Sequence, residues 1–175
     1  MSDLLEALAA PSAVQPLPKD IWFGTSGPRD ARIMIVGEAW GSEEEIKKQP
    51  FVGTSGLELT KMLNEAGIDR LSCFVTNCVP RRPPANDIKE FFHAAPRKTD
   101  KNYPFHSHLF RNCYPNDVLR AGVDTLYAQI RHVKPDLIIA LGNTAFWALS
   151  KECRASRVEG KLVPAGISDF RGSML

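Results

Sequence analysis

The chain has 175 residues, of which 43% are hydrophobic and 24% are charged, and its formal net charge at pH 7 is +2. This length and composition predict one globular domain with a sizeable core and exclude a globally disordered chain. No apolar run approaches the roughly 18 residues of a membrane-spanning helix, and the chain starts with acidic residues where a secretory signal has basic ones. We therefore expect a cytoplasmic protein without a membrane partner.

The distribution of charge along the chain and the spacing of its cysteines further limit the class of protein. Residues 79–175 carry 15 basic and 9 acidic side chains, whereas residues 1–78 carry 7 basic and 11 acidic ones. A basic second half is typical of a chain that meets a polyanion, although a solvated basic surface is the commoner explanation. The four cysteines include no CxxC pair, so we expect reduced, mostly buried thiols rather than a disulfide framework.

Residues 1–30 are expected to form an N-terminal helix and a lead-in segment, because an amphipathic start is followed by prolines and glycine turns. The apolar run over residues 33–36, stopped by a glycine, predicts a strand that is buried on both faces. Ser55 and Glu58 have the spacing of a capping box, and the apolar residues that follow predict a helix over residues 56–66.

The second half repeats this alternation around an irregular insertion. The segment SCFVTN predicts a second short strand with Asn77 at its carboxyl end. Prolines and the lack of a period make residues 87–116 a loop region. Asn116 is a good N-cap for a helix that ends before Pro135. The segment DLIIALGNTAFWALS predicts a third strand, followed by a helix that begins at Asn143.

Strands that alternate with helices predict an α/β fold: a three-layer α/β/α sandwich around a short central parallel sheet. Such sheets bind ligands at the carboxyl ends of their strands. Residues 37–41, Asn77 and residues 142–143 are expected at this edge. Neither GxGxxG nor GxxxxGK[ST] occurs in the sequence, which excludes a Rossmann or P-loop nucleotide site.

Three side chains near this edge are candidates for function. Glu38 is the acid that we expect to face the edge, because it directly follows the buried strand, whereas residues 43–45 fall where a helical turn would expose them to solvent. Its alternative role is to cap the turn. Phe51 either packs inward or presents a stacking face from its glycine-rich loop. Asn77 lines the edge or caps the next element.

The motifs GEAWG, QPFVGTSG, TNCVPRRPP and KPDLIIALGNTA, in this order and spacing, resemble the uracil-DNA glycosylase superfamily and are closest to its family 4 type. The resemblance covers residues 31–148. It implies a uracil-DNA glycosylase-like domain over residues 31–175 that is incomplete at its C-terminus. Such a domain holds a uracil base that is flipped out of the DNA.

The resemblance also implies a role for each candidate residue. Phe51 would stack on the uracil ring, and Asn77 would hydrogen-bond its Watson–Crick edge, whose donor and acceptor pattern differs from that of cytosine. Glu38 would orient or activate the water that attacks C1′ of the sugar. Backbone N–H groups around Gly37 and Ala39 would help to hold the departing uracil.

Further contacts are expected with the DNA backbone. Arg81 and Arg82 would neutralise phosphates, with a solvated loop as the alternative reading of this pair. Ser55 lies where a helix begins, and the backbone N–H groups there are able to hold a phosphate. The expected partners are uracil-containing DNA, single- or double-stranded, and a replication or repair protein. The chain itself is expected to be a monomer.

The cysteines depart from the family pattern. Family 4 enzymes hold an iron–sulfur cluster on four cysteines, but residues 1–72 contain none, and Arg81 stands at the position of the family's loop cysteine. We therefore predict no cluster, no other cofactor and no metal site. A zinc site is a weaker alternative, with the candidate ligands His106, His108 and Cys113.

Two further departures concern the pocket. Trp40 replaces the proline of the family's GEAPG motif, so its ring would pack beside the pocket or touch DNA. The last histidine is His132, and the chain ends where the family approaches its fourth strand. The family's catalytic histidine motif is therefore absent from this sequence, and whether the last strand is missing stays open.

Two functions of different classes follow. The first is a uracil-DNA glycosylase that binds uracil-containing DNA and hydrolyses the N-glycosidic bond of a flipped deoxyuridine, with an activity that is weak or lost if one stabiliser of the leaving group is missing. The second is a non-catalytic domain of the same fold that binds DNA or another protein.

Overall fold

The computed structural model describes residues 17–93, 114–150 and 173–174. The longer elements, in chain order, are β1 (Ile33–Ala39), α2 (Ser42–Lys47), α3 (Thr54–Glu65), β2 (Phe74–Val79), α4 (Asp117–Val133), β5 (Leu137–Ala140) and α5 (Asn143–Ser150). The short ones are the 3₁₀ turns η1 (Arg70–Ser72), η2 (Pro84–Asn86) and η3 (Ile88–Phe91) and the strands β3 (Phe92–His93), β4 (Tyr114–Pro115) and β6 (Ser173–Met174). The expected N-terminal helix lies outside the described residues.

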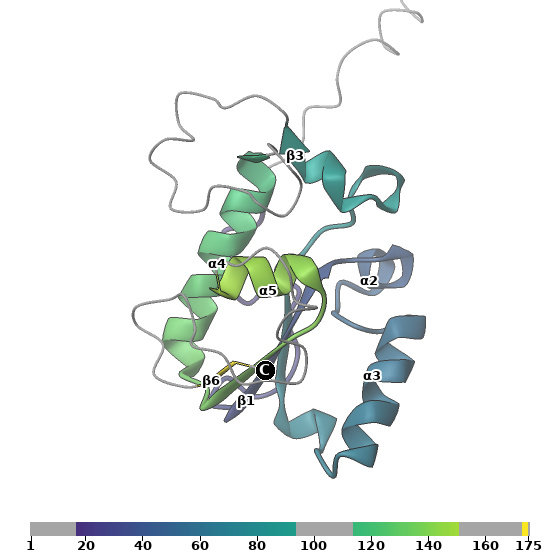
Figure 1. Ribbon diagram of the computed structural model, residues 1–175, viewed down its shortest axis with the longest axis vertical. Helices are drawn as coiled ribbons and strands as arrows, with labels where there is room; N and C mark the ends of the chain where they lie inside the picture. The colour runs from purple at the N-terminus through teal and green to yellow at the C-terminus, as the bar shows by residue number, and fades with distance from the viewer. Residues whose placement is uncertain (1–16, 94–113, 151–172, 175) are drawn as a thin grey trace, which may run out of the picture.

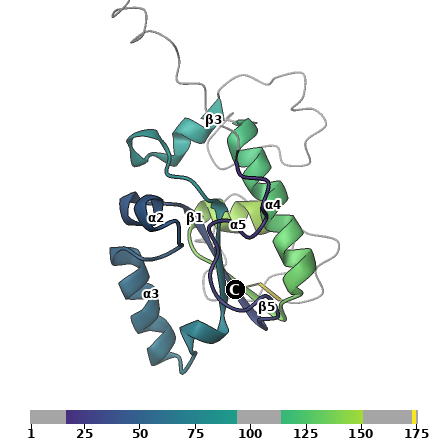
Figure 2. The same cartoon turned by 180° about the vertical axis from the view of Figure 1, so that it is seen from behind.

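Two hydrophobic cores lie on the two faces of the central sheet. On one face, side chains such as Met34 and Phe74 pack with α4 and with Trp147 of α5. On the other face, Ile35 packs with Leu59 of α3. Figure 1 and the reverse view in Figure 2 show α3 and α4 on opposite sides of the sheet. The predicted three-layer α/β/α sandwich is therefore confirmed.

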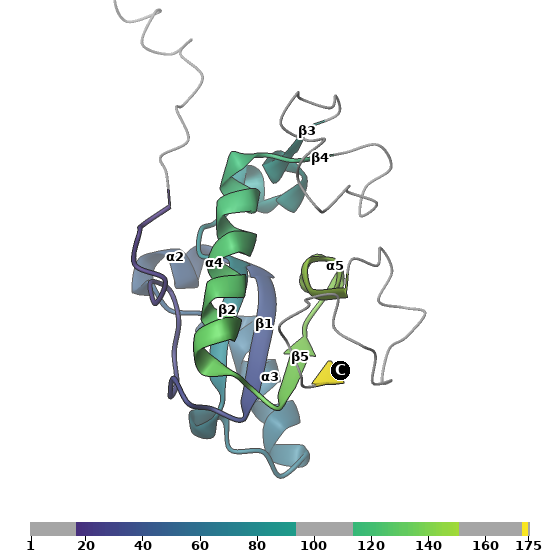
Figure 3. The ribbon, with the colours of Figure 1, turned by 90° about the vertical axis from the view of Figure 1, so that its left-hand side faces the viewer.

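The central sheet is parallel and has the strand order β2-β1-β5-β6. Figure 3 shows these strands side by side. The fourth strand position, which the sequence left open, is occupied by residues 173–174, which pair with the start of β5. β1 runs beyond the predicted apolar run as far as Ala39, and its register places Gly37 opposite Asn77 of β2.

Local signals explain how the helices begin. The Asn116 side chain accepts hydrogen bonds from the N–H groups of Val118 and Leu119, both at 3.1 Å, so the predicted N-cap of α4 is confirmed. The capping box predicted at Ser55 is wrong, because α3 has Gly53 as its N-cap and no side-chain cap. Within the described ranges, none of the helices combines the length and hydrophobicity needed to cross a bilayer.

The lead-in segment over residues 17–30 packs against the sheet. The Trp22 ring lies edge-on to the Phe74 ring, with centroids 5.9 Å apart. Gln129 of α4 donates a hydrogen bond from Nε2 to the Ile21 carbonyl at 2.5 Å. Ser26 forms an antiparallel bridge with Val75 and thereby pairs part of the outer edge of β2, which would otherwise be open to other strands.

Candidate functional site

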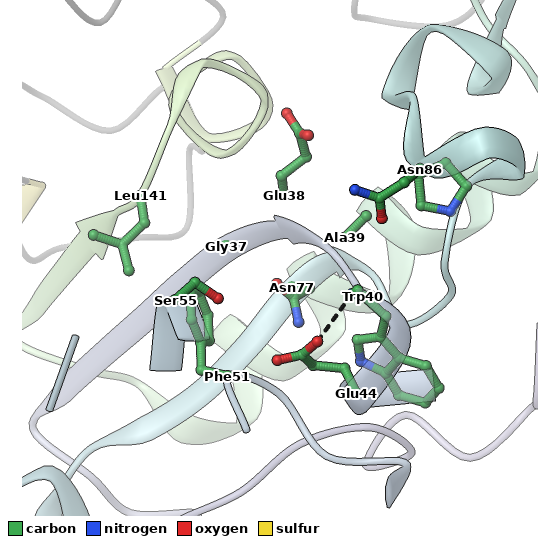
Figure 4. Close-up of a pocket in the computed structure, with 12 residues that line it drawn as sticks. Gly37, Glu38, Ala39, Trp40, Glu44, Phe51, Ser55, Asn77, Asn86 and Leu141 are labelled. Carbon is green, nitrogen blue, oxygen red and sulfur yellow. Dashed lines mark hydrogen bonds between the residues drawn. The ribbon is translucent and has the colours of Figure 1, made fainter. Parts of the chain in front are cut away.

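A cavity of about 290 Å³ opens at the carboxyl ends of β1 and β2 (Figure 4). Parallel sheets bind ligands at this edge, and the volume lies near the lower limit for small-molecule pockets. The cavity is lined by six of the predicted site residues, namely Gly37, Glu38, Ala39, Phe51, Ser55 and Asn77. The fold thus brings together residues from β1, β2, the loop before α3 and the first turn of α3.

Gly37 has no room for a side chain. A Cβ atom at this position would overlap Cζ of the Phe51 ring and Oδ1 of Asn77. The bare backbone of β1 therefore lets the ring and the amide approach the end of the strand. Asn77 is buried, and its Nδ2 has no hydrogen-bond partner among the described residues. Leaving a buried amide unpaired costs about 1–3 kcal/mol, which a ligand carbonyl would offset.

Phe51 is held in an unusual backbone conformation. Its φ of 53° lies in the left-handed region, which costs a residue other than glycine about 1–3 kcal/mol. The turn around it is tight, because a Cβ on Gly56 would overlap the Phe51 carbonyl. The ring is half-buried and lines the cavity. Its position leaves an aromatic surface available to a flat ligand.

Glu38 leaves β1 on the face that is covered by α5. Its carboxylate accepts a hydrogen bond from Oγ1 of Thr144, a buried residue in the first turn of α5. In Figure 4 the carboxylate lies above the β1 ribbon, on the same side as the Asn86 amide, whereas Phe51 lies below the ribbon in this view. Glu38 is therefore at the cavity with one of its oxygens already oriented.

Asn86 was not among the predicted site residues, although it lines the cavity. It belongs to η2, in which Ala85 and Asn86 both have positive φ values, of 50° and 58°. The turn-forming motif RRPPAND signals a bend here, and Asn tolerates the left-handed region better than most residues. Sequence alone does not specify that the bend turns this amide toward the cavity.

Glu44 corrects the prediction that residues 43–45 are all solvated, because its side chain is only 5% exposed. Its carboxylate accepts hydrogen bonds from the N–H groups of Val52 and Gly53, both at 2.9 Å, and of Gly41 at 3.1 Å. Burial alone would raise the pKa of this carboxyl group, but these backbone donors outweigh it and hold the pKa below its ordinary value. Glu44 thus joins the loop after β1 to the loop that carries Phe51.

The lowered pKa of Glu44 predicts an acid-sensitive fold. The bound carboxylate adds stability in full above its unfolded pKa of about 4.5, and this contribution is lost as the pH falls through the lower folded value. We expect Glu44→Gln to reduce the free energy of unfolding at pH 7 by about 1–3 kcal/mol. The variant should also show a weaker dependence of this free energy on pH below about 4.5. Urea unfolding at several pH values measures both effects.

Glu43→Gln is the matched control for this prediction, because Glu43 is exposed and is paired only on the surface with Lys47. Such pairs contribute little to stability. If both variants lose stability equally at pH 7, the role assigned to the buried Glu44 carboxylate is wrong.

Trp40 forms part of the cavity wall. Its side chain is buried, and the centroid of its ring lies 5.4 Å from that of the Phe23 ring in the lead-in segment. Trp40 therefore packs beside the pocket, which was one of its two expected roles. The backbone N–H of Trp40 donates to the Arg81 carbonyl at 3.2 Å. Because the Gly41 N–H is bound by Glu44, two backbone donors of this loop are already bound within the protein.

Arg81 and Arg82 follow β2 but do not line the cavity. Both side chains are half-buried. The Arg81 carbonyl helps to hold the loop after β1 through its bond to Trp40. A DNA-backbone contact stays a prediction for both arginines, as does a phosphate contact at Ser55, which is exposed at the edge of the cavity.

The cysteines that the structure describes do not fit an iron–sulfur cluster. Cys73 and Cys78 are both buried, and they belong to the hydrophobic cores on opposite faces of the sheet. Burial, and then the nearby Glu38 carboxylate, raise the pKa of the Cys78 thiol far above its ordinary value, which opposes the thiolate form that binds iron. Among residues 17–93, 114–150 and 173–174, no cluster of three metal-binding side chains occurs.

The candidate zinc ligands His106, His108 and Cys113 lie outside the described residues, as does the fourth cysteine, Cys153. The prediction that the protein has no cluster and no zinc site therefore stays a prediction.

The protein has an α/β fold with a small cavity at the carboxyl edge of its parallel sheet, and an aromatic ring and a buried amide line that cavity. The family model of the uracil DNA glycosylase superfamily matches residues 23–170. The chain belongs to this superfamily, which confirms the resemblance drawn from its motifs.

Curated relatives place the similarity within one type of the superfamily. The chain is 35% identical over 136 residues to the type-4 uracil-DNA glycosylase of Thermotoga maritima, which covers 77% of this chain and 58% of that protein. It is 34% identical over 151 residues to the type-4 enzyme of Saccharolobus solfataricus, covering 83% and 58% of the two chains. It is 33% identical over 119 residues to the type-4 uracil-DNA glycosylase of Archaeoglobus fulgidus, and the match covers 68% of this chain and 47% of that protein. The chain spans about half the length of these relatives.

Proposed function

We propose that this chain is a uracil-DNA glycosylase, which binds single- or double-stranded DNA containing uracil and hydrolyses the N-glycosidic bond of a flipped deoxyuridine. The observation that carries the proposal is the Asn77 amide, which is buried at the cavity beside the Phe51 ring, with its Nδ2 unpaired among the described residues. Uracil is a flat ring with a donor and an acceptor side by side, and it complements both groups.

Base discrimination follows from the direction of two hydrogen bonds. Nδ2 of Asn77 would donate to O4 of uracil, and Oδ1 would accept from N3–H, whereas cytosine presents the opposite pattern at these atoms. Stacking on an aromatic side chain such as Phe51 adds about 1–3 kcal/mol per base. These contacts need a base outside the stack, so the nucleotide must be flipped or single-stranded.

The reaction would use the polar side of the cavity. Glu38 would hold a water near the Asn86 amide, and the water oxygen would bond to C1′ while the bond from C1′ to N1 of uracil breaks. The electron pair leaves with the base, and the proton released by the water passes to the Glu38 carboxylate. The sugar gains positive charge in this step, which the carboxylate stabilises.

The surroundings would hold the base and the DNA. Gly37 and Ala39 would contact the base through their backbone, since Gly37 has no room for a side chain. Because the backbone N–H groups of Trp40 and Gly41 are bound within the protein, the charge on the departing uracil would be met in part by the Asn77 amide. Arg81, Arg82 and Ser55 would contact phosphates.

Excision of uracil tests the proposal directly. Oligonucleotides with one deoxyuridine, single- and double-stranded, should accumulate alkali-sensitive abasic sites when incubated with the protein, whereas matched thymidine strands should not. Because a positioned acid or base contributes about 10²–10⁴ to a rate, we expect Glu38→Gln to slow excision by at least about 100-fold. Glu65→Gln, a change on the exposed end of α3, should leave the rate unchanged.

The outcome also separates the second candidate function. If the protein forms no abasic sites but still binds uracil strands more tightly than thymine strands, it is a non-catalytic binder with this fold. If it forms none and ignores the base, the proposed function is wrong.

A further inference from the structure

The loop that carries Phe51 is held by a side chain that does not line the cavity. Arg70, in η1, donates a hydrogen bond from Nη2 to the Phe51 carbonyl at 2.7 Å. Its Nη1 donates to the Gly56 carbonyl at 2.8 Å and to Oγ1 of Thr60 at 2.7 Å. One guanidinium therefore joins the Phe51 peptide, in the loop between α2 and α3, to the first turns of α3.

Arg70 is itself held in place by the local structure. The Asp69 side chain caps η1 by accepting a hydrogen bond from the Leu71 N–H at 3.0 Å. This cap fixes the backbone from which the arginine reaches across to α3. A planar guanidinium offers several N–H donors in a rigid fork, so it can bind these acceptors at once, which a lysine ammonium on a flexible stem does not reproduce.

The loop has the properties that such a support explains. Phe51 is in the left-handed region, where residues other than glycine persist only when their surroundings hold them. Glu44 binds the N–H groups of Val52 and Gly53, while Arg70 binds the carbonyls of Phe51 and Gly56. Opposite charges thus hold the donors and the acceptors of one short segment, residues 51–56, which runs from the loop into the first turn of α3. Because the carbonyl and the ring belong to one residue, fixing the peptide also limits the direction of the ring.

We propose that Arg70 is a positioning residue, which sets the Phe51 ring as the stacking wall of the base cavity and thereby sets the preference for uracil. The proposal rests on the proposed function, because it assigns to Phe51 the task of stacking on the base. Arg70 acts only through the loop, since it contacts the Phe51 peptide and is not part of the cavity lining.

The test compares Arg70→Ala and Arg70→Lys with Arg32→Ala, a matched control whose exposed arginine is paired with Asp136, the residue directly before β5. Two quantities are measured in the full chain. The first is hydrogen exchange of the backbone amides over residues 52–56. The second is the ratio of dissociation constants for single strands that differ only in one thymidine or one non-cleavable 2′-fluoro-deoxyuridine.

We expect Arg70→Ala to speed exchange in the loop by about tenfold or more and to reduce the uracil preference by a similar factor, because hydrogen bonds from a charged donor are lost. Binding of the thymidine strand should stay unchanged, which a general loss of structure would not allow. Arg70→Lys should recover part of the preference, and methylguanidinium should restore it in Arg70→Ala but not in Asn77→Ala. Arg32→Ala should match the unaltered chain.

Other results of this experiment would overturn either the role of Arg70 or the proposed function. A normal preference and normal loop exchange in Arg70→Ala would overturn that role, and if that variant does not fold, the same comparison is made with Arg70→Lys. If the unaltered chain has no uracil preference, the proposed function fails. Hydrogen exchange over residues 52–56 in Arg70→Ala then tests the role of Arg70 by itself. Faster exchange than in the unaltered chain supports positioning of Phe51, and unchanged exchange overturns it.

Discussion

Asn77→Ala is expected to remove the preference for uracil and to weaken binding of a uracil strand by about 10–100-fold, because the base would lose both hydrogen bonds to its Watson–Crick edge. Asn77 is only 4% exposed, so water reaches the position poorly and cannot replace the amide well. Fluorescence anisotropy with a non-cleavable deoxyuridine strand, at one fixed salt concentration, measures the loss without any need for turnover.

Two further variants sharpen this prediction. Asn77→Asp offers acceptors only and should repel O4 of uracil, so it should lose at least as much affinity as Asn77→Ala. Asn64→Ala changes an exposed asparagine of α3 and should bind like the unaltered chain. A uracil preference that survives in Asn77→Ala would remove this residue from the recognition site.

Gly37→Ala is expected to reduce uracil binding by about 100-fold or more while the fold persists. The added methyl group would overlap the Phe51 ring and the Asn77 amide, so at least one of the two must leave its place at the cavity. Overpacking of this kind also destabilises a protein by about 1–3 kcal/mol. The same binding measurement, combined with thermal unfolding, separates lost recognition from lost stability.

Gly53→Ala is the glycine control for this result. A Cβ at Gly53 would make ordinary contacts with Glu43 and Glu44, its φ of −90° suits alanine, and its N–H would remain available to Glu44. We expect little change in binding. If Gly37→Ala and Gly53→Ala bind uracil strands equally well, the cavity beside Gly37 does not hold the base.

Much of the fold could be predicted because its signals are local. The run IMIV and the polar residues that follow it predicted β1 and its edge, and Asn116 predicted the start of α4. Four of the predicted site residues, Gly37, Glu38, Ala39 and Asn77, meet at one cavity because parallel strands bring their carboxyl ends to the same edge of the sheet, whatever their separation in the chain.

The rest depends on contacts that no local pattern encodes. Glu44 lies in a run of acids that looks solvated, but it is buried because the N–H donors of Val52 and Gly53 fold back onto it. The same carboxylate binds the N–H of Gly53, the residue from which α3 begins without the predicted cap. Arg70 looks like an ordinary surface arginine until the loop of Phe51 is placed beside it. Such residues have signatures only in three dimensions, since their partners are set by the fold.

The cavity at the carboxyl edge of the sheet is proposed to hold a uracil base outside the stack. The most direct test of this proposal is the affinity of the unaltered chain for three single strands that differ at one position, carrying non-cleavable 2′-fluoro-deoxyuridine, the matching 2′-fluoro-deoxycytidine or thymidine. Because two hydrogen bonds separate the uracil and cytosine patterns, we expect the uracil strand to bind at least about tenfold more tightly than the cytosine strand. Equal affinity for the three strands would contradict the proposal.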